Sequence, residues 1–486
     1  MKFQDASIPQ LSRNASRLFS RCSLWIVLCL SIFVLASAPL AHCQEDSENS
    51  ATTPWWTYFG QNSTDIINTI NSKNARITNI TFDTTSSTFT VTYVPNTGSY
   101  AKQWWWYVGI DAPTLAQNLT NNHARLVSLQ AYDIGGGNIR FAVAMIANAG
   151  ADAKTWWYTF GQSGTGITNL VNANHARLTT LESYVSNGQT YYAAIMISNT
   201  GTGAKAWWWF PGASGQTIAN AANSNQARIL YLSSASNGNF NAVLESCSSG
   251  CPGWAWYYGY NGGDIVSKAH SSNARILTVD NYPGCGGQCY VATMISDNGY
   301  AAPAGPASIA ETQNWTFGNG VPVGGNSDFT VWANGSILFE GHLHDSGFPS
   351  YNDTVVCVIK DNQTKTAYVL PPHSGHMDGT IESGSRDDNW VIQSSSTELA
   401  NNWDEFASGS TWNCQASSSA DWNVLANDAL AVVGVVLSVV QLAAPAAAAD
   451  NHIPGMNRDV TASLLYPNIR MMERPVSRSM SMVRQN

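Results

Sequence analysis

The chain has 486 residues, which is enough for two or three domains. Charged residues make up only 11% of it, against roughly 25% in typical globular proteins, and the net charge is -9. No basic patch in the repeats could neutralise phosphates, so this balance argues against nucleic acid as a partner. A surface covered by Asn, Ser, Thr and Gly instead of ions favours an extracellular protein.

The N-terminal residues 1–43 have the pattern of a secretory signal peptide. Basic residues precede an uncharged run whose apolar core spans 24–36, and small residues follow that core. Such a segment sends the chain out of the cytoplasm and is then removed. The basic lead-in is long, so an uncleaved signal anchor is the alternative.

Aromatic runs recur along residues 54–302 at nearly equal spacing. Five of these runs end in a glycine, and each glycine is followed 16 residues later by the arginine of an Ala-Arg-Ile/Leu step. The steps between successive glycines are 49, 52, 51 and 47 residues. The repeat arginines are Arg76, Arg125, Arg177, Arg228 and Arg275. A period near 50 predicts an array of repeats, a propeller or a closed ring.

The second copy illustrates the expected content of one unit. Trp104 begins an aromatic strand that ends at Val108 and is predicted to be buried on both faces. A short helix, a strand and a return strand follow over residues 114–119, 125–132 and 139–148. In the third copy the hairpin turn is Asn187-Gly188, which is typical of a type I′ turn. We therefore predict a β-rich α+β fold made of strand-helix-hairpin units.

A unit of this size cannot bury its aromatic strand alone, so neighbouring units must cover it. Five copies either close into a ring or stack as a short solenoid. The ring is favoured because a solenoid leaves exposed edges at both ends. The segment from Trp315 to Gly318 repeats the start of the first unit and is a candidate closing strand. These patterns predict a closed or nearly closed ring over residues 54–318.

The recurring Trp and Arg side chains have two interpretations. In the structural one, the Trp side chains form the core and the arginines tie neighbouring units through backbone carbonyls. In the functional one, they form a surface that stacks on sugar rings or cations. The strict repetition favours the structural interpretation, because a binding site rarely needs five identical buried strands.

Six of the nine cysteines lie outside the signal segment. Two pairs flank short predicted turns, where a cross-strand bridge is sterically reasonable, and the last two cysteines remain for each other. The predicted disulfides are Cys247–Cys251, Cys285–Cys289 and Cys357–Cys414. The alternative is a zinc site made by the first two pairs, which the secreted context and the lack of nearby histidines disfavour.

The Trp-Trp-Trp-Tyr-x-Gly start, the short helix and the Ala-Arg-Ile/Leu step together resemble the repeats of bacterial tandem repeat domains. The same repeats form the N-terminal half of fungal polyglycine hydrolases. The resemblance covers residues 54–302 and implies a recognition or accessory role. In the hydrolases a serine β-lactamase-like domain with a Ser-x-x-Lys motif follows. This chain is too short after residue 302 for that domain, and its one match, Ser99 to Lys102, lies in a repeat loop.

Residues 325–450 are predicted to form a small β-rich module with an apolar C-terminal helix. The candidate ligand-binding residues of this module are His342, His344, Asp345, His373, His376 and Asp378. In a strand, His342 and His344 share a face, which is how a metal pair is presented. No full ligand signature is present, so we predict no metal, no other cofactor and no catalytic residue. Hydrogen-bonded histidines in polar turns are the favoured interpretation.

Residues 429–449 are uncharged, rich in Ala and Val, and of transmembrane length. The basic tail over 451–486, which is predicted to be disordered, has the sign of a cytoplasmic flank. A buried helix is nevertheless favoured over a membrane anchor, because the run is low in Leu, Ile and Phe. Membrane attachment through 429–449 is the alternative.

These features predict a secreted, non-catalytic recognition protein of adhesion type that binds an extracellular polysaccharide or protein. The alternative function is a secreted hydrolase. It would be metal-assisted through the C-terminal histidines, or act on a Gly-rich peptide by analogy with the family that the repeats resemble.

Overall fold

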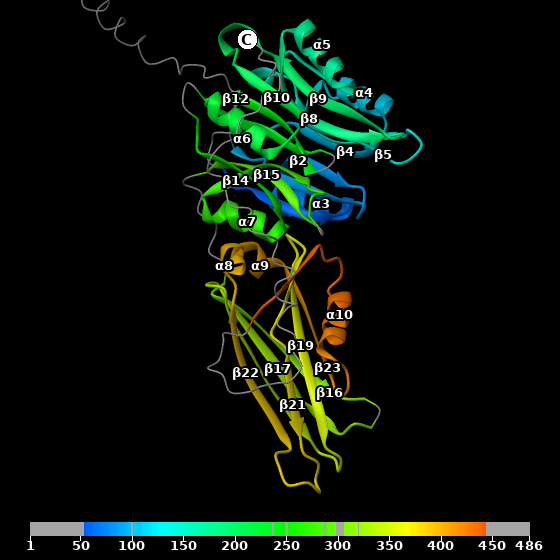
Figure 1. Cartoon of the computed structure of the whole chain (residues 1–486), viewed down its shortest axis with the longest axis vertical. Helices are drawn as coiled ribbons and strands as arrows, with labels where there is room; N and C mark the ends of the chain where they lie inside the picture. Colours follow the sequence, from blue (N-terminus) through cyan, green and yellow to red (C-terminus); the bar gives the residue numbers. More distant parts are fainter. Residues whose placement is uncertain are drawn as a thin grey trace, which may run out of the picture. The chain divides into compact units, whose positions relative to one another are not determined.

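The computed structural model describes residues 53–98, 101–235, 238–247, 251–285, 288–297, 306–318 and 320–443. The predicted signal peptide over 1–43 and the predicted disordered tail over 451–486 lie outside the described residues. Within the described residues, eight α-helices and seven sheets form a β-rich fold (Figure 1). The predicted fold class is confirmed at this level.

Each repeat unit contains a strand, a helix and two further strands in the predicted order. The second unit consists of β4 (Trp104–Ile110), α4 (Ala112–Asn121), β5 (Ala124–Asp133) and β6 (Ile139–Ala147). The return strand β6 lies between β4 and β5 in an antiparallel three-stranded sheet. The aromatic strand is therefore an edge strand of its own sheet.

The other four units repeat this arrangement (Figure 1). The first has β1 (Trp56–Gln61), α3 (Ser63–Lys73), β2 (Ala75–Asp83) and β3 (Thr88–Pro95). The third has β7 (Trp156–Gln162), α5 (Gly164–Asn174), β8 (Ala176–Ser186) and β9 (Gln189–Ser198). The fourth has β10 (Trp207–Ala213), α6 (Gly215–Ser224), β11 (Ala227–Ser234) and β12 (Phe240–Ser246). The fifth has β13 (Trp254–Tyr260), α7 (Gly262–Ser271), β14 (Ala274–Asn281) and β15 (Tyr290–Ser296).

The constant spacing of 16 residues between glycine and arginine has a local cause. The glycine has a positive φ in every unit, for example 69° at Gly109, and the register of the aromatic strand shifts there. Asn, Asp or Ser then caps the helix with its side chain, as Asp111 does for α4. The helix is followed by a left-handed residue with φ of 46° or 47° in all five units, such as His123. Kink, capped helix and left-handed turn together fix the distance to the next strand.

The aromatic strand of each unit packs into two cores. Trp105 and Tyr107 belong to the core of their own unit, whereas Trp104 and Trp106 belong to the core of the first unit. The residues of β4 nevertheless remain half-buried, apart from the exposed Gly109. The predicted full burial of the aromatic strand is therefore wrong for β4, and it holds for Trp207–Phe210 of β10.

The first unit covers the fifth in the same way. Trp55 and Phe59 lie in the core of the fifth unit, and the Phe59 ring meets the Tyr290 ring edge-on at 4.6 Å. The Val279 amide donates to the Asn79 side chain at 3.1 Å. No sheet of the described residues closes on itself, because side chains make the contacts between units. The structure thus shows five packed sheets, and ring closure stays a prediction.

The predicted closing strand at Trp315 to Gly318 is wrong. Its first two residues, Trp315 and Thr316, end β16 (Ser308–Thr316), which pairs with β17 (Val323–Trp332) in the C-terminal module. The Trp315 indole donates to the Ser327 hydroxyl at 3.1 Å across this pair. The fifth unit needs no extra strand, because the first unit already covers it.

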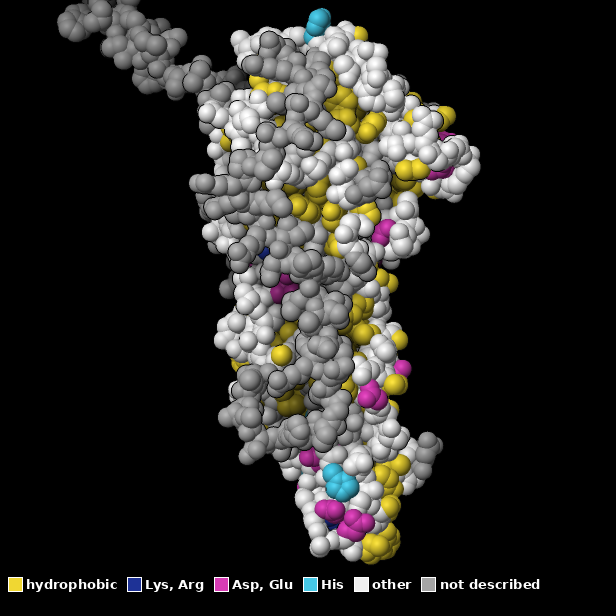
Figure 2. Space-filling model, in the orientation of Figure 1, with side chains coloured by type: hydrophobic (Ala, Val, Ile, Leu, Met, Phe, Trp, Pro, Cys, Tyr) yellow, Lys and Arg dark blue, Asp and Glu magenta, His cyan; other side chains and the backbone are white. Residues whose placement is uncertain are grey.

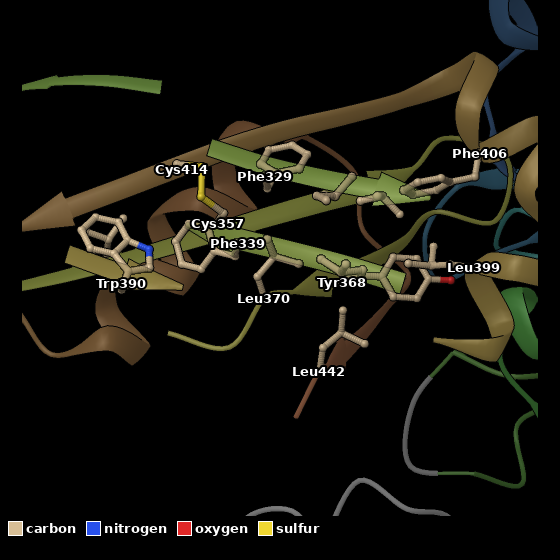
Figure 3. Close-up of a cluster of buried hydrophobic side chains, with 14 of the residues drawn as sticks. Phe329, Phe339, Cys357, Tyr368, Leu370, Trp390, Leu399, Phe406, Cys414 and Leu442 are labelled. Atoms are coloured by element: carbon tan, nitrogen blue, oxygen red, sulfur yellow. A yellow bond between two sulfur atoms is a disulfide. The ribbon is translucent and has the colours of Figure 1, made fainter. Parts of the chain in front are cut away.

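The C-terminal module contains two sheets that share one hydrophobic core. The first sheet consists of β16, β17, β18 (Ser336–Asp345) and β22 (Asp387–Ser395). The second consists of β21 (His373–Met377), β19 (Tyr351–Asp361), β20 (Thr366–Val369) and β24 (Ser438–Gln441), and β23 (Ser410–Ser417) also pairs with β19. Phe329 and Phe339 of the first sheet pack with Tyr368 of the second (Figure 3).

The three predicted disulfides are present. Cys357–Cys414 joins β19 to β23 inside this core (Figure 3). Cys247–Cys251 and Cys285–Cys289 each close a short loop in the repeat domain. The sulfur atoms are therefore bonded to one another, and the zinc alternative for the first two pairs is excluded.

Two short helices of the module contact the first and fifth units. They are α8 (Thr397–Asn401) and α9 (Trp403–Gly409). Glu405 of α9 accepts hydrogen bonds from the Tyr58 hydroxyl at 2.5 Å and from the Lys73 ammonium at 2.8 Å. The Asn401 carbonyl lies 2.5 Å from a ring nitrogen of His270. The module thus contacts the two units that also meet each other.

The predicted apolar helix over 429–449 is wrong in its extent. The helix α10 spans Trp422–Val432, and Gly434 then adopts a φ of 82°, which a continuing helix does not allow. The chain continues into β24, which pairs in parallel with β20. Across the part of the chain that the structure describes, none of the helices has the length and apolar character needed to cross a membrane. Residues 444–449 lie outside that part.

Candidate functional site

His342 and His344 lie on one exposed face of β18. The Nδ1 atom of His344 is 2.7 Å from a carboxylate oxygen of Asp387, and Nδ1 of His342 is 3.0 Å from the side-chain oxygen of Asn389. Both partners belong to the neighbouring strand β22. Figure 2 shows histidine and acidic side chains together on the surface of the C-terminal module.

Three of the other predicted residues do not join this pair. Asp345 is fully buried and accepts a hydrogen bond from the Gly347 amide at 2.7 Å. His376 is exposed and lies against Asn352 at 2.8 Å and Asp378 at 3.4 Å. The six predicted residues therefore do not converge on a single centre.

His373 belongs to a cluster that the sequence reasoning missed. Its Nε2 atom lies 2.5 Å from Oδ2 of Asp388 and 3.6 Å from Oδ2 of Asp353. One ligand atom from each residue lies within 4.8 Å of the others, and no other His, Cys, Asp or Glu group in the described ranges converges in this way. A carboxylate at an inward position of a strand, as Asp353 is in β19, was the signal available in the sequence.

The repeat domain contains a pocket of about 700 Å³ that the sequence reasoning also missed. It lies where the second strands of the five units end, and all five units contribute to its wall. Six of the lining residues are Phe82, Asp83, Tyr132, Asp133, Tyr184 and Tyr282. Aromatic rings and carboxylates thus line one opening, to which the fourth unit adds Ser234 and Ala235.

The wall of the pocket continues into a polar centre between the second strands. The residue five positions after each repeat arginine is polar and lies here: Thr81, Gln130, Glu182, Ser233 and Asp280. These side chains bond neighbouring units, as when the Ser233 hydroxyl donates to the Leu181 carbonyl at 2.8 Å. Polar side chains thus replace the backbone ladder that these strands lack. Five polar residues at one repeat position were a readable signal for this centre.

The pocket is acidic. Burial opposes the ionisation of Asp83, but hydrogen bonds from Gln288, Thr85 and Ser86 outweigh it and lower its pKa. Hydrogen bonding from the Ser186 hydroxyl lowers the pKa of Asp133.

Two other carboxyls that line the pocket, Asp280 and Glu182, have raised instead of lowered pKa values. Burial raises the pKa of Asp280 to about 6, and burial together with the charge of Asp280 raises that of Glu182 well above its ordinary value. The lining residues include no Lys or Arg among the described residues. The rim therefore carries negative charge at neutral pH.

The repeat arginines lie away from the pocket. Arg177 and Arg228 both pair with Glu245, at 2.9 Å and 3.3 Å. Arg275 lies 4.0 Å from Asp297. Arg125 is half-buried, and its Nε atom donates to the Asp152 carbonyl at 3.2 Å. Arg76 is buried, and neither it nor Trp104 lines the pocket.

No protein-family model and no curated protein matches this chain. The resemblance to tandem repeat domains therefore depends on the repeat motifs alone. A fold alone does not determine function, which depends on the chemistry of the sites.

Proposed function

We propose that this chain is a secreted, non-catalytic recognition protein whose five repeats form a closed ring around the acidic pocket. The observation that carries the proposal is that all five units line one pocket of about 700 Å³. This volume lies within the usual range for binding sites, and aromatic walls with a few placed polar groups are typical of them. The packing of Trp55 and Phe59 on the fifth unit supports closure. A recognition role also agrees with what the resemblance to tandem repeat domains implies.

The ligand is a segment of an extracellular polysaccharide or protein that carries an amine or guanidinium group. Asp83 and Asp133 are held ionised at the rim by the hydrogen bonds that lower their pKa values. Tyr132, Tyr184 and Tyr282 add ring faces, which attract cations as well as carbohydrate. No Lys or Arg lines the wall among the described residues, so the ionised rim carboxylates of Asp83 and Asp133 attract a bound cation without opposition from a lining cation.

The test is a titration of the full chain with two sugars that share one backbone: a hexamer of glucosamine, which carries amines, and a hexamer of N-acetylglucosamine, in which each amine is an uncharged acetamide. We expect the amine-bearing hexamer to bind and the acetylated one to bind at least about tenfold more weakly, since acetylation removes the charge. Hexalysine serves as the peptide arm. Isothermal titration calorimetry at low and high salt measures all three.

Two variants connect this binding to the pocket. Asp83→Asn and Asp133→Asn should each weaken the binding of the amine-bearing ligand, because each removes a negative charge from the rim. The matched control is Asp428→Asn, which changes an exposed carboxylate of α10 in the C-terminal module. Equal affinity in all three variants, or equal binding of the charged and acetylated hexamers, would contradict the proposal.

The alternative of a metal-assisted hydrolase used six residues that the structure places in separate clusters. No observation at those residues favours hydrolysis over recognition. The function proposed here therefore does not depend on them.

A further inference from the structure

Within the described residues, the C-terminal module buries a carboxylate for which no hydrogen-bond donor is present. Asp353 lies on β19 and is only 2% exposed. Neither of its carboxylate oxygens has a hydrogen-bond partner among the described residues. Burying a carboxylate in this way is costly unless a proton or a cation compensates for it.

A second carboxylate lies close to Asp353. It belongs to Asp388 of β22, and one carboxylate oxygen of each residue lies within 4.8 Å of the other, so two like charges face each other. The two carboxylates come from different sheets, since β19 and β22 belong to the two separate sheets of the module. A cation between them would convert repulsion between the sheets into attraction.

The third group of the cluster is a nitrogen donor with a fixed direction. The His373 ring stacks on the Trp390 ring, with 4.2 Å between centroids and 12° between planes. Its Nε2 atom faces both carboxylates, at 2.5 Å from Asp388 and 3.6 Å from Asp353. A metal ligand needs this kind of support from neighbouring groups to hold its orientation.

Two glycines leave room for this arrangement. A Cβ atom at Gly375 would lie 1.7 Å from Oδ2 of Asp388, so any larger residue there would push this carboxylate away. A Cβ atom at Gly341 would lie 2.1 Å from the Trp390 ring on which His373 stacks. At both positions, neighbouring side-chain atoms lie so close that a residue with a Cβ atom would force them to move.

We propose that Asp353, His373 and Asp388 bind a divalent transition-metal ion, with zinc or manganese as the ions of matching chemistry, and that this ion joins the two sheets of the C-terminal module. Imidazole together with carboxylate suits these ions. Calcium is disfavoured because it prefers six to eight oxygen ligands, whereas one of the three donors here is a nitrogen. The site is distinct from the acidic pocket of the repeat domain.

The experiment uses the full, disulfide-bonded chain after chelator treatment and desalting. Zn²⁺, Mn²⁺ and Ca²⁺ are titrated separately by calorimetry, and the bound metal is counted by elemental analysis after gel filtration. We expect about one zinc or manganese ion per chain, a higher Tm with the ion bound, and no comparable effect of calcium. A wild-type chain that takes up neither ion would overturn the proposal.

Asp353→Asn is the decisive variant because it remains informative without metal. Replacing the carboxylate by a neutral amide removes the repulsion from Asp388, so we expect the metal-free variant to melt higher than the metal-free wild type. We also expect its zinc affinity to fall by at least about 100-fold, since even outer-shell partners are worth 10- to 100-fold. An affinity like that of the wild type would show that the ion binds elsewhere.

Three further variants locate the ion. Gly375→Ala should weaken binding by displacing Asp388. His376→Gln, on the same strand but outside the cluster, should leave binding unchanged. The double variant His342→Gln/His344→Gln removes the exposed pair on β18 and should also retain the ion. Loss of the ion in the double variant with retention in Asp353→Asn would assign the metal to the surface pair instead.

Discussion

The repeat domain and the C-terminal module both bury carboxylates, but the neighbours of these carboxylates differ. Glu245 in the repeat domain lies among three cations, at 2.9 Å from Arg177, 3.3 Å from Arg228 and 2.8 Å from Lys205. Asp353 in the C-terminal module has no hydrogen-bond donor among the described residues and faces another carboxylate. The charge of Glu245 is compensated by cations of the chain itself, whereas that of Asp353 would be compensated by adding a positive charge.

This difference indicates how structural and binding carboxylates can be distinguished in one molecule. Glu245 pairs with arginines from two units, so it ties the third unit to the fourth. A buried ion pair is costly to break, because the remaining partner is left uncompensated. A buried carboxylate without a partner gains stability when it is neutralised. Substitutions at the two sites should therefore change stability in opposite directions.

The largest effect is expected from Glu245→Ala. Removing this carboxylate leaves Arg177 and Arg228 buried without their partner, which should cost about 3–5 kcal/mol of unfolding free energy. Unfolding in guanidinium chloride, followed by tryptophan fluorescence, measures the change. Glu311→Gln, at an exposed position of β16, is the control. A denaturation midpoint equal to that of this control would show that Glu245 does not hold the two units together.

A comparison of two phenylalanines tests whether the repeats form a ring. Phe59 packs across the junction of the first and fifth units, and Phe240 packs across the junction of the fourth and fifth. Both are buried, so each change to Ala should cost about 3 kcal/mol if the two junctions are equivalent. The same unfolding measurement applies. A solenoid predicts that Phe59→Ala costs much less than Phe240→Ala.

The repeat arginines should differ among themselves. Arg177→Ala should lower the unfolding free energy by about 2 kcal/mol or more, because Glu245 loses a partner and the arginine is buried. Arg125 is half-buried and bonds a backbone carbonyl, so Arg125→Ala should cost about 1 kcal/mol. Thermal melts of both variants, with ligand binding measured in parallel, test this order. Arg177→Ala with an unchanged Tm and lost ligand binding would make the arginine functional instead.

The sequence predicted the repeated unit well because its signals are local. Residues such as Gly109 and Asp111 mark turns and caps within a few positions, and Asn187-Gly188 adopts the two positive φ values of its predicted turn, 49° and 77°. The disulfides followed from cysteine spacing. Turns, caps and disulfides that depend only on residues nearby in the sequence could therefore be predicted from it.

The sequence carried signals for single positions of the two candidate sites but not for their partners, because each site combines distant strands. Asp353 and Asp388 meet only when the two sheets of the module face each other, and nothing near either residue indicates that partner. The histidine pair on β18 was easier to see because its members are two residues apart, yet it lies apart from this cluster. Trp315 was assigned to the wrong domain because a short motif resembled the repeat, whereas strand pairing placed it in the module.

The smallest effect concerns the polar centre of the repeat domain and depends on pH. Burial and the charge of Asp280 raise the pKa of Glu182, so the folded chain holds a proton that the unfolded chain releases above about pH 4.5. The contribution of Glu182 to the stability of the wild type therefore falls as the pH rises above that value. Glu182→Gln carries no such proton, and its side-chain oxygen can still accept the hydrogen bond from the Tyr231 hydroxyl.

Relative to the wild type, Glu182→Gln should therefore gain stability between pH 5 and pH 8, as measured by denaturant unfolding at each pH. Asp133→Asn should change stability with pH in the opposite direction, because the hydrogen bond from Ser186 lowers the pKa of the Asp133 carboxyl and favours its charged form. The stability that Asp133 contributes is present above its unfolded pKa, so its variant should be the weaker one at neutral pH. A difference between Glu182→Gln and the wild type that stays constant with pH would mean that Glu182 is ionised in the folded chain. Its neighbours would then compensate that charge as fully as the arginines compensate Glu245.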